Sequence, residues 1–105
     1  MPAISETIHL TLEDAAVAVR ERRVSSAELT EACLARIESV EPHLNAFVTV
    51  TADVARAQAR EAGDEIAAGR YRGPLHGIPI AVKDLFATKG IRTTAGSRIL
   101  ANWIP

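Results

Sequence analysis

The stretch Gly73-Pro-Leu-His-Gly-Ile-Pro-Ile-Ala-Val-Lys-Asp84 decides which fold the sequence predicts. Its apolar part, residues 78–83, lies between a glycine and an aspartate, which is typical of a short β-strand. The proline inside the run favours an edge strand or an irregular start. Lys83 would then lie at the carboxyl end of the strand, where catalytic groups of α/β folds often emerge.

Capping patterns predict three helices before this strand. A hydroxyl residue precedes each of them, at Thr11, Ser25 and Thr51, and can accept hydrogen bonds from free N–H groups of the first turn. A carboxylate lies three residues after each of the first two hydroxyls, in the manner of a capping box. Pro42 is expected to end the second helix, and a left-handed Gly69 the third.

Residues 47–50 are β-forming and predict a second short strand. The order helix, helix, strand, helix, strand, loop then predicts an α/β fold with helices packed on a sheet. Two strands do not make a stable sheet by themselves, so the sheet is expected to be incomplete in this chain. We therefore interpret residues 1–105 as the N-terminal part of a single domain, with 1–72 mainly helical and 73–105 forming a strand and a loop.

Charge and cysteine content argue against several classes of function. The formal net charge is −1, and the basic cluster Arg20-Glu-Arg-Arg23 is expected at a helix C-terminus, where cations are favoured. Direct nucleic-acid binding is therefore not predicted. The histidines and the single cysteine show no ligand spacing, so neither a metal nor a cofactor is expected. Cys33 is interpreted as a small core residue on the apolar stripe of the second helix.

The sequence also lacks the apolar patterns of membrane and secreted proteins. No apolar run approaches the roughly 18 residues that a membrane span requires. Residues 1–12 have no cationic region followed by an apolar one, so no signal peptide is predicted. We expect a soluble cytoplasmic protein without membrane contact.

Lys83 has two interpretations on the local pattern alone. It could be a surface lysine, with its aliphatic stem over apolar neighbours and its ammonium group in water. It could instead be partly desolvated, which would lower its pKa from about 10.4 towards neutrality and allow it to act as a base. The local pattern leaves both interpretations open.

The stretch 73–84 resembles the lysine motif of the amidase-signature family. Lys89-Gly-Ile-Arg-Thr-Thr-Ala-Gly-Ser97 resembles the loop that follows that motif. Ser25-Ser-Ala-Glu-Leu29 and Glu41-Pro-His-Leu-Asn-Ala-Phe47 resemble the N-terminal region of the family. Together these matches cover the chain from about residue 10 to residue 105. The resemblance implies that the expected strands belong to the mixed sheet of the amidase-signature fold.

The resemblance also implies a Ser–cis-Ser–Lys mechanism that hydrolyses the C–N bond of a small carboxamide, with Lys83 as the catalytic base. In the family both serines lie in a glycine- and serine-rich stretch further along the chain, so this chain alone is expected to be inactive. Ser97 matches a structural loop of the family and is not interpreted as the nucleophile. Asp84 is expected to anchor the loop by hydrogen bonds, and His76 to be a loop residue rather than a general base.

Three functions follow from this interpretation. The first is the N-terminal segment of an amidase, with a small-molecule amide as substrate and either a homo-oligomer or the remainder of the amidase chain as partner. The second is a truncated, non-catalytic interaction module. The third is the A subunit of a tRNA-dependent amidotransferase, which would have protein partners and a glutamine substrate.

Overall fold

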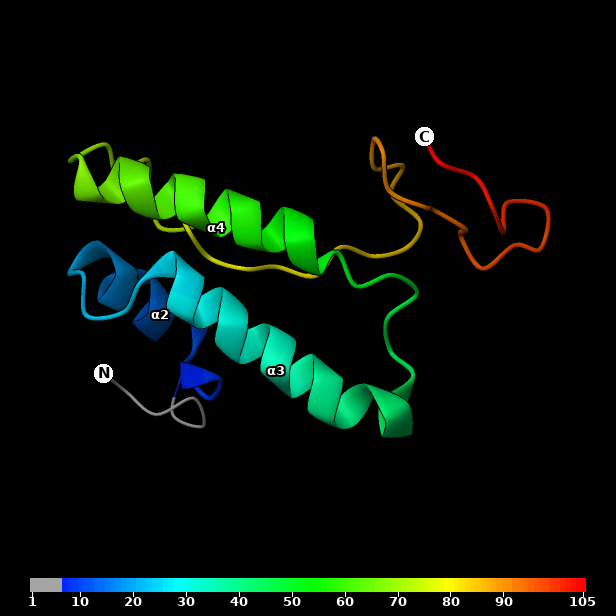
Figure 1. Ribbon diagram of the computed structural model, residues 1–105, viewed down its shortest axis with the longest axis horizontal. Helices are drawn as coiled ribbons and strands as arrows, with labels where there is room; N and C mark the ends of the chain where they lie inside the picture. The colour runs from blue at the N-terminus through cyan, green and yellow to red at the C-terminus, as the bar shows by residue number, and fades with distance from the viewer. Residues whose placement is uncertain (1–6) are drawn as a thin grey trace. The chain divides into compact units, whose positions relative to one another are not determined.

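The computed structural model describes residues 7–105, and this part of the chain contains three α-helices (Figure 1). Helix α2 spans Leu12–Arg20, α3 spans Ser26–Leu44 and α4 spans Ala52–Ala67. The chain divides into two compact units. The first contains the chain up to Leu44 together with Thr51–Pro79, and the second consists of Asn45–Val50 and Ile80–Pro105.

The starts of the helices confirm two of the three predicted caps. Thr11 Oγ1 accepts a hydrogen bond from the backbone N–H of Asp14 at 3.1 Å. Ser25 Oγ accepts one from the N–H of Glu28 at 3.0 Å, immediately before α3. Each such cap stabilises a helix by about 1 kcal/mol. Thr51 does precede α4, but its side chain makes no capping hydrogen bond, so that part of the prediction was wrong.

The sequence predicts the end of α4 correctly but not the end of α3. Helix α3 continues through Pro42 to Leu44, so the predicted end at the proline was wrong. A proline in the last turn removes a single hydrogen bond, which a long packed helix tolerates.

Gly69 follows α4 with a φ of +83°, in the left-handed conformation that was predicted. Its N–H donates to the Ile66 carbonyl at 3.0 Å, while the next N–H, of Arg70, donates to Glu65 at 2.9 Å. These two bonds form a Schellman motif.

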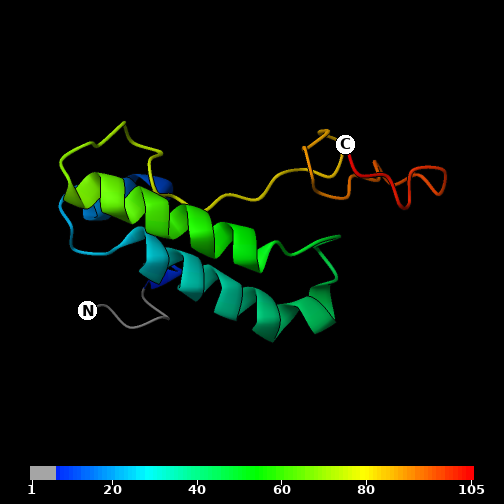
Figure 2. The same cartoon turned by 45° about the horizontal axis from the view of Figure 1, so that its top comes forward.

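Helices α3 and α4 lie side by side in both ribbon views (Figures 1 and 2). Three of their buried residues are alanines, Ala32, Ala59 and Ala62, which allow close approach but bury little apolar area each. An ion pair bridges the two helices, with 2.6 Å between Arg56 Nε and Glu31 Oε1. Both side chains are exposed to water, so the pair contributes little to stability. The core cluster of the first unit joins all three helices: Ala15, Ala18, Val19, Val24, Leu29 and Ile66, with Tyr71 and Ile78 packed against it.

The loop after α4 packs closely on the helices at Gly77. Its φ is +80°, and a Cβ placed there would come within 3.2 Å of the Ser26 Cβ and 3.4 Å of Ile66 Cδ1. A larger residue would therefore be strained and crowded at once. Cys33, on α3, is half-buried, and this burial raises the pKa of its thiol, in keeping with a packing role.

The prediction of an α/β fold with a mixed sheet was wrong. Neither 47–50 nor 78–83 forms a strand, and residues 7–105 contain no sheet. Strand propensity reflects packing on a pleated, half-buried surface beside a paired backbone. No such surface is formed here, because most of the side chains in both stretches are exposed. The second unit is built instead from turns and bends, drawn in orange and red at its C-terminal end (Figure 1).

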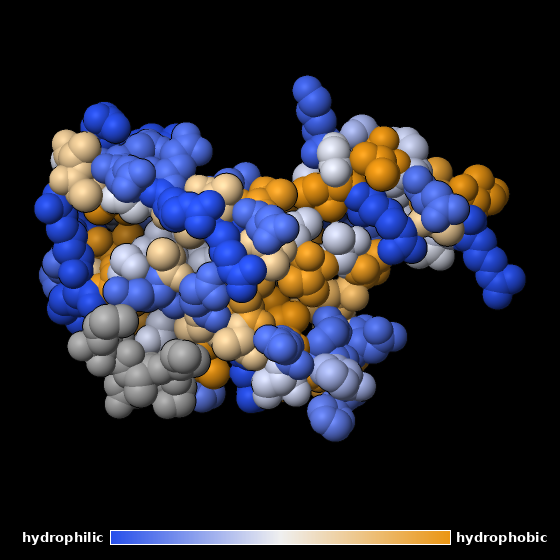
Figure 3. All heavy atoms as spheres, in the orientation of Figure 1, coloured by the Kyte–Doolittle hydropathy of each residue, from blue (hydrophilic) through white to orange (hydrophobic). Residues whose placement is uncertain are grey.

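Large apolar side chains remain exposed in the second unit. Ile80 is 76% exposed and Ile99 is 93% exposed. The others are Phe47, Val48, Val50, Val82, Leu85, Phe86, Trp103 and Ile104. Apolar side chains are visible at the surface of this stretch in the space-filling view (Figure 3). Exposed apolar groups of this density favour association with other chains.

We expect the 105-residue chain to self-associate, and Ile99→Lys to weaken that association about tenfold because the burial of one isoleucine is lost. Size-exclusion chromatography with light scattering over a concentration series measures the effect. Leu75→Lys is the matched control, because Leu75 is 63% exposed but belongs to the first unit. A wild-type chain that melts sharply and stays monomeric at 11.2 kDa would contradict the prediction.

Candidate active site around Lys83

Lys83 lies at the start of a turn rather than at the end of a strand. Its backbone carbonyl accepts a hydrogen bond from the N–H of Phe86 at 3.1 Å. Its side chain is exposed, and within residues 7–105 no ion-pair partner accompanies it. A lysine that acts as a base must be shielded from water to favour its neutral form. The described part of the chain places Lys83 in a defined turn but does not itself provide this shielding.

Asp84 is bound to a segment ten residues further along the chain. Its Oδ1 accepts a hydrogen bond from the backbone N–H of Thr94 at 2.8 Å, and its Oδ2 accepts a short one from the Thr94 hydroxyl. Its backbone carbonyl accepts the N–H of Ala95, also at 2.8 Å. Asp84 therefore anchors the loop by hydrogen bonds, as predicted from the sequence.

The hydrogen bonds of Asp84 also affect its ionisation. The Thr94 hydroxyl, followed by the Thr94 N–H, stabilises the carboxylate form and holds the pKa of Asp84 below its ordinary value. Arg92 adds a smaller favourable charge interaction. The ionised carboxylate accepts both hydrogen bonds from Thr94, whereas the bond from the Ala95 N–H to the Asp84 backbone carbonyl does not depend on ionisation.

Two adjacent threonines form the centre of the second unit. Thr93 and Thr94 are buried, at 3% and 7% exposure. The N–H of Thr93 donates to the Trp103 carbonyl at 3.0 Å, and its hydroxyl donates to Ile91 at 3.0 Å. The same hydroxyl accepts the N–H of Thr88 at 3.4 Å. The role of these threonines was missed in the sequence, although hydroxyl side chains that bond to nearby backbone groups are a known alternative to regular structure.

The serines of the chain have structural positions where the structure describes them. Ser97 Oγ accepts the N–H of Ile99 at 3.2 Å, and the Ser97 N–H donates to Thr94 at 2.8 Å, so Ser97 is part of the same loop. Ser25 caps α3, Ser26 is buried in its first turn and Ser39 is exposed on the same helix. Ser5 lies outside the described residues. No hydrogen bond joins a serine to Lys83 within residues 7–105.

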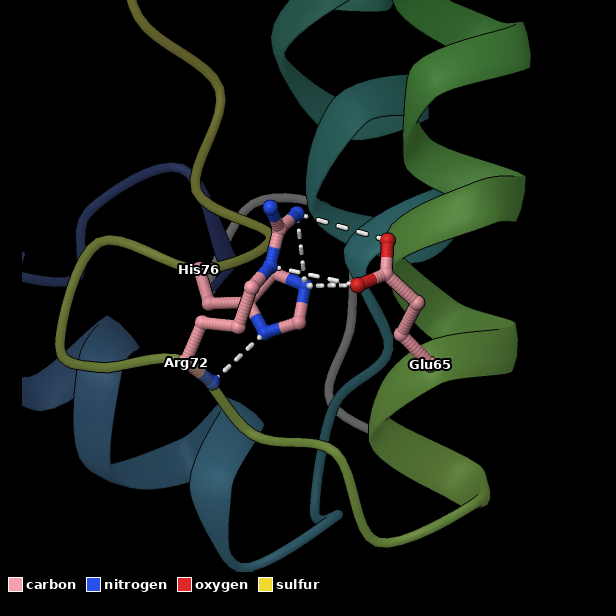
Figure 4. Close-up of polar contacts among 3 residues, drawn as sticks. All are labelled: Glu65, Arg72 and His76. Carbon is pink, nitrogen blue, oxygen red and sulfur yellow. Dashed lines mark hydrogen bonds and ion pairs between the residues drawn. The ribbon is translucent and has the colours of Figure 1, made fainter.

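His76 belongs to a cluster in the first unit with Glu65 and Arg72 (Figure 4). The backbone N–H of Arg72 donates to His76 Nδ1 at 3.0 Å, which leaves the proton of a neutral ring on Nε2. His76 Nε2 lies 3.7 Å from Glu65 Oε2, and Arg72 Nε lies 3.1 Å from the same oxygen. The imidazole is buried and its nitrogens face these partners, so it ties the loop to α4. The role of Glu65 and Arg72 was also missed in the sequence.

A hollow of about 290 Å³ borders this cluster and is lined by Arg72, Gly73, Pro74, Leu75 and His76. It contains no candidate nucleophile. Among the described residues, no group of three or more His, Cys, Asp or Glu side chains could hold a metal ion. None of the helices within residues 7–105 has both the length and the apolar character needed to cross a membrane.

Comparison with known proteins identifies the family. The model of the family described as Amidase matches residues 28–105. The chain belongs to the amidase family. This finding confirms the resemblance on which the sequence interpretation rests, and Lys83, Asp84 and Thr94 all lie within the matched residues.

The chain is similar to proteins named as the A subunit of glutamyl-tRNA(Gln) amidotransferase. It is 53% identical over 100 residues to the one from Geotalea daltonii, which covers 95% of this chain and 20% of the relative. Identity is 51% over 102 residues to the one from Granulibacter bethesdensis, covering 97% of this chain and 20% of the relative. The chain thus spans about a fifth of the length of the curated relatives it matches. No solved structure shows a significant match.

We expect the Asp84 carboxyl to titrate below the ordinary aspartate value of about 3.9. Because its pKa is lowered in the folded state, the hydrogen bonds of Asp84 stabilise the loop above the unfolded pKa. That stabilisation is lost as the pH falls through the folded value. Thr94→Val removes the hydroxyl, which is the largest cause of the shift, and should return the pKa towards its ordinary value. Carbon-13 NMR of the Asp84 carboxyl carbon measures this pKa in the wild-type chain and in Thr94→Val. An Asp84 pKa at or above about 3.9 in the wild-type chain would contradict the assignment.

Proposed function

We propose that this chain supplies the base of an amide-hydrolysing site, and that Lys83 is that base. The observation that carries the proposal is the match of the Amidase family to residues 28–105, which include the whole lysine motif. The geometry of the second unit supports it, since Lys83 begins a turn and the next residue is tied to the 94–95 segment. We propose that residues 1–105 form part of a single amidase domain.

The proposed mechanism is that of a Ser–cis-Ser–Lys triad. Neutral Lys83 accepts a proton from a bridging serine, which in turn deprotonates the nucleophilic serine. The nucleophile attacks the carboxamide carbon, and the proton held by Lys83 passes back through the bridging serine to the leaving nitrogen. The C–N bond then breaks, which releases ammonia or an amine and leaves an acyl-enzyme. Water then hydrolyses the ester, and backbone N–H groups stabilise the oxyanion in both steps. Neither serine is assigned to this chain.

To act as a base, Lys83 has to be in its neutral form, which surroundings of low polarity favour. Lys83 is exposed in this chain. We propose that the remainder of an amidase chain covers it, supplies both serines and provides the low-polarity surroundings that favour the neutral amine. The exposed apolar side chains around the lysine motif, among them Ile80 and Val82, support such a covering.

The names of the relatives favour an amidotransferase, in which this chemistry would act on a particular amide. Each is the A subunit of a glutamyl-tRNA(Gln) amidotransferase, at about half identity. We therefore propose, as a second and more specific function, that the chain belongs to the A subunit of a tRNA-dependent amidotransferase, with glutamine as the amide and other subunits as partners. The two functions differ in substrate: a general amidase accepts simple carboxamides, whereas the amidotransferase prefers glutamine.

The 105-residue chain alone is expected to release no ammonia from simple carboxamides or from glutamine, because no serine within residues 7–105 is placed to act with Lys83. An enzymatic ammonia assay after repurification measures this. Ser97→Ala is the diagnostic variant. Ammonia release that is present in the wild-type chain and lost in Ser97→Ala would show that Ser97 is a nucleophile and would overturn this assignment of the serines.

A chimera provides the test of Lys83. Residues 1–105 replace the matching fifth of the Geotalea daltonii relative, and the unmodified relative serves as the positive control. We expect the chimera to release ammonia and Lys83→Ala to lower that rate by at least about 10²–10⁴-fold, the usual range for a general base. Lys89→Ala is the matched control, since Lys89 is also an exposed lysine of the second unit.

Two results would contradict the proposal. One is a Lys83→Ala chimera that keeps more than about a tenth of the rate, because the loss of a general base is larger than that. The other is an inactive, correctly folded chimera beside an active relative, which would favour the non-catalytic module. The ratio of the rates on glutamine and on simple carboxamides decides between the two enzymatic functions.

A further inference from the structure

The turn that begins at Lys83 is held by a hydrogen bond on its C-terminal side, whereas the residues before Lys83 have no regular structure. The Lys83 carbonyl accepts the N–H of Phe86, which fixes the residues that follow it. Residues 80–83 themselves are exposed and belong to neither a helix nor a strand. The conformation of the Lys83 backbone therefore depends on how firmly its neighbour Asp84 is held.

Asp84 is held by both its carboxylate oxygens and its backbone carbonyl. All three accept hydrogen bonds from residues 94 and 95, so Asp84 and this segment close a loop of ten residues. Thr94 is buried, and its hydroxyl also accepts the N–H of Gly96 at 3.2 Å. The hydroxyl thus links Asp84 to the backbone on the far side of the loop.

We propose that Asp84 and Thr94 are positioning residues for Lys83. Asp84 does not act on substrate; its hydrogen bonds to Thr94 fix the backbone from which the lysine side chain extends. A lysine side chain has a flexible four-carbon stem, so a fixed backbone is needed to keep its amine within hydrogen-bond reach of a serine. This inference rests on the proposed role of Lys83 as the base.

Thr94 offers a pair of variants that separates positioning from stability. Thr94→Val keeps the shape and the backbone N–H but removes the hydroxyl, so Asp84 Oδ2 and the Gly96 N–H lose their shared partner. Thr94→Ser keeps the hydroxyl but removes a buried methyl group. If the hydroxyl positions Lys83, the valine variant is the impaired one and the serine variant is not. If Thr94 serves only packing, the order is reversed.

The first measurement uses the 105-residue chain itself. Amide hydrogen exchange by mass spectrometry reports on the Phe86 N–H, which closes the turn at Lys83. We expect exchange at Phe86 to be at least about tenfold faster in Thr94→Val than in the wild type, since local opening governs exchange. Thr94→Ser should exchange at the wild-type rate. Equal protection of Phe86 in all three proteins would overturn the proposal without any reference to activity.

The second measurement uses the active chimera. A displacement of a catalytic group by about 1 Å costs about 10²-fold in rate, so Thr94→Val and Asp84→Asn should lower kcat about 10–100-fold and leave KM nearly unchanged. Thr94→Ser should restore most of kcat even where its melting temperature is lower. Each rate is divided by the concentration of active sites, taken from the acyl-enzyme burst, so that unfolded protein does not count.

The results also separate this inference from the proposed function. If Lys83→Ala abolishes activity while Thr94→Val and Asp84→Asn keep the full kcat, Lys83 is the base but the positioning role is wrong. A rise in KM without a fall in kcat would likewise overturn it, because it would place Asp84 or Thr94 in substrate binding. If Lys83→Ala keeps its activity, both the function and the positioning role are wrong.

Discussion

The hydrogen bonds between Asp84 and Thr94 are the interaction on which the lysine-bearing unit depends. Backbone groups that leave water must find partners, and in most folds helices or sheets provide them. The second unit has neither within the described residues. Backbone hydrogen bonds of its turns pair some of these groups, and the carboxylate of Asp84 and the buried hydroxyls of Thr93 and Thr94 pair others. Side chains here replace the regular ladder of a sheet.

Both ends of the lysine motif are anchored, each within its own unit. At the beginning of the motif, Gly77 lies against Ser26 and Ile66, and His76 is tied to α4 through Glu65. At its end, Asp84 is tied to Thr94. The residues between these anchors, 78–83, carry the lysine and have no regular structure of their own. Each end of the motif is therefore held by contacts with residues outside the motif, within its own unit.

Most features that depend only on neighbouring residues could be predicted from the sequence, although the cap at Thr51 could not, and features that depend on distant residues could not. The caps at Thr11 and Ser25 and the left-handed Gly69 need only a few adjacent residues, and all three are present. A strand at 78–83 needs a paired backbone from elsewhere, and the local pattern carries no information about whether one is available. Pro42 departs from this division, because it is a local signal and yet α3 continues through it to Leu44.

The candidate site follows this division as well. Lys83 was singled out from a long contiguous motif, and its catalytic role stays a prediction. The anchoring role of Asp84 was predicted from its position beside Lys83, and its hydrogen bonds to Thr94 confirm it. Thr94 could not be singled out, because its partner is ten residues away and the chain between them has no recognisable period. Glu65 and Arg72 were missed for a related reason, since their meeting depends on how the loop after α4 folds back.

The second unit is discontinuous, and this affects how the chain can be dissected. Residues 45–50 lie between α3 and α4 in the sequence, yet they belong with residues 80–105. A fragment that begins at residue 80 lacks residues 45–50. A fragment that ends at residue 79 contains residues 45–50 but lacks residues 80–105, with which they form one unit. A protease cut after residue 50 would likewise separate the two parts of the second unit. Fusion or truncation boundaries for the lysine-bearing part therefore have to enclose α4 entirely, even though that helix belongs to the other unit.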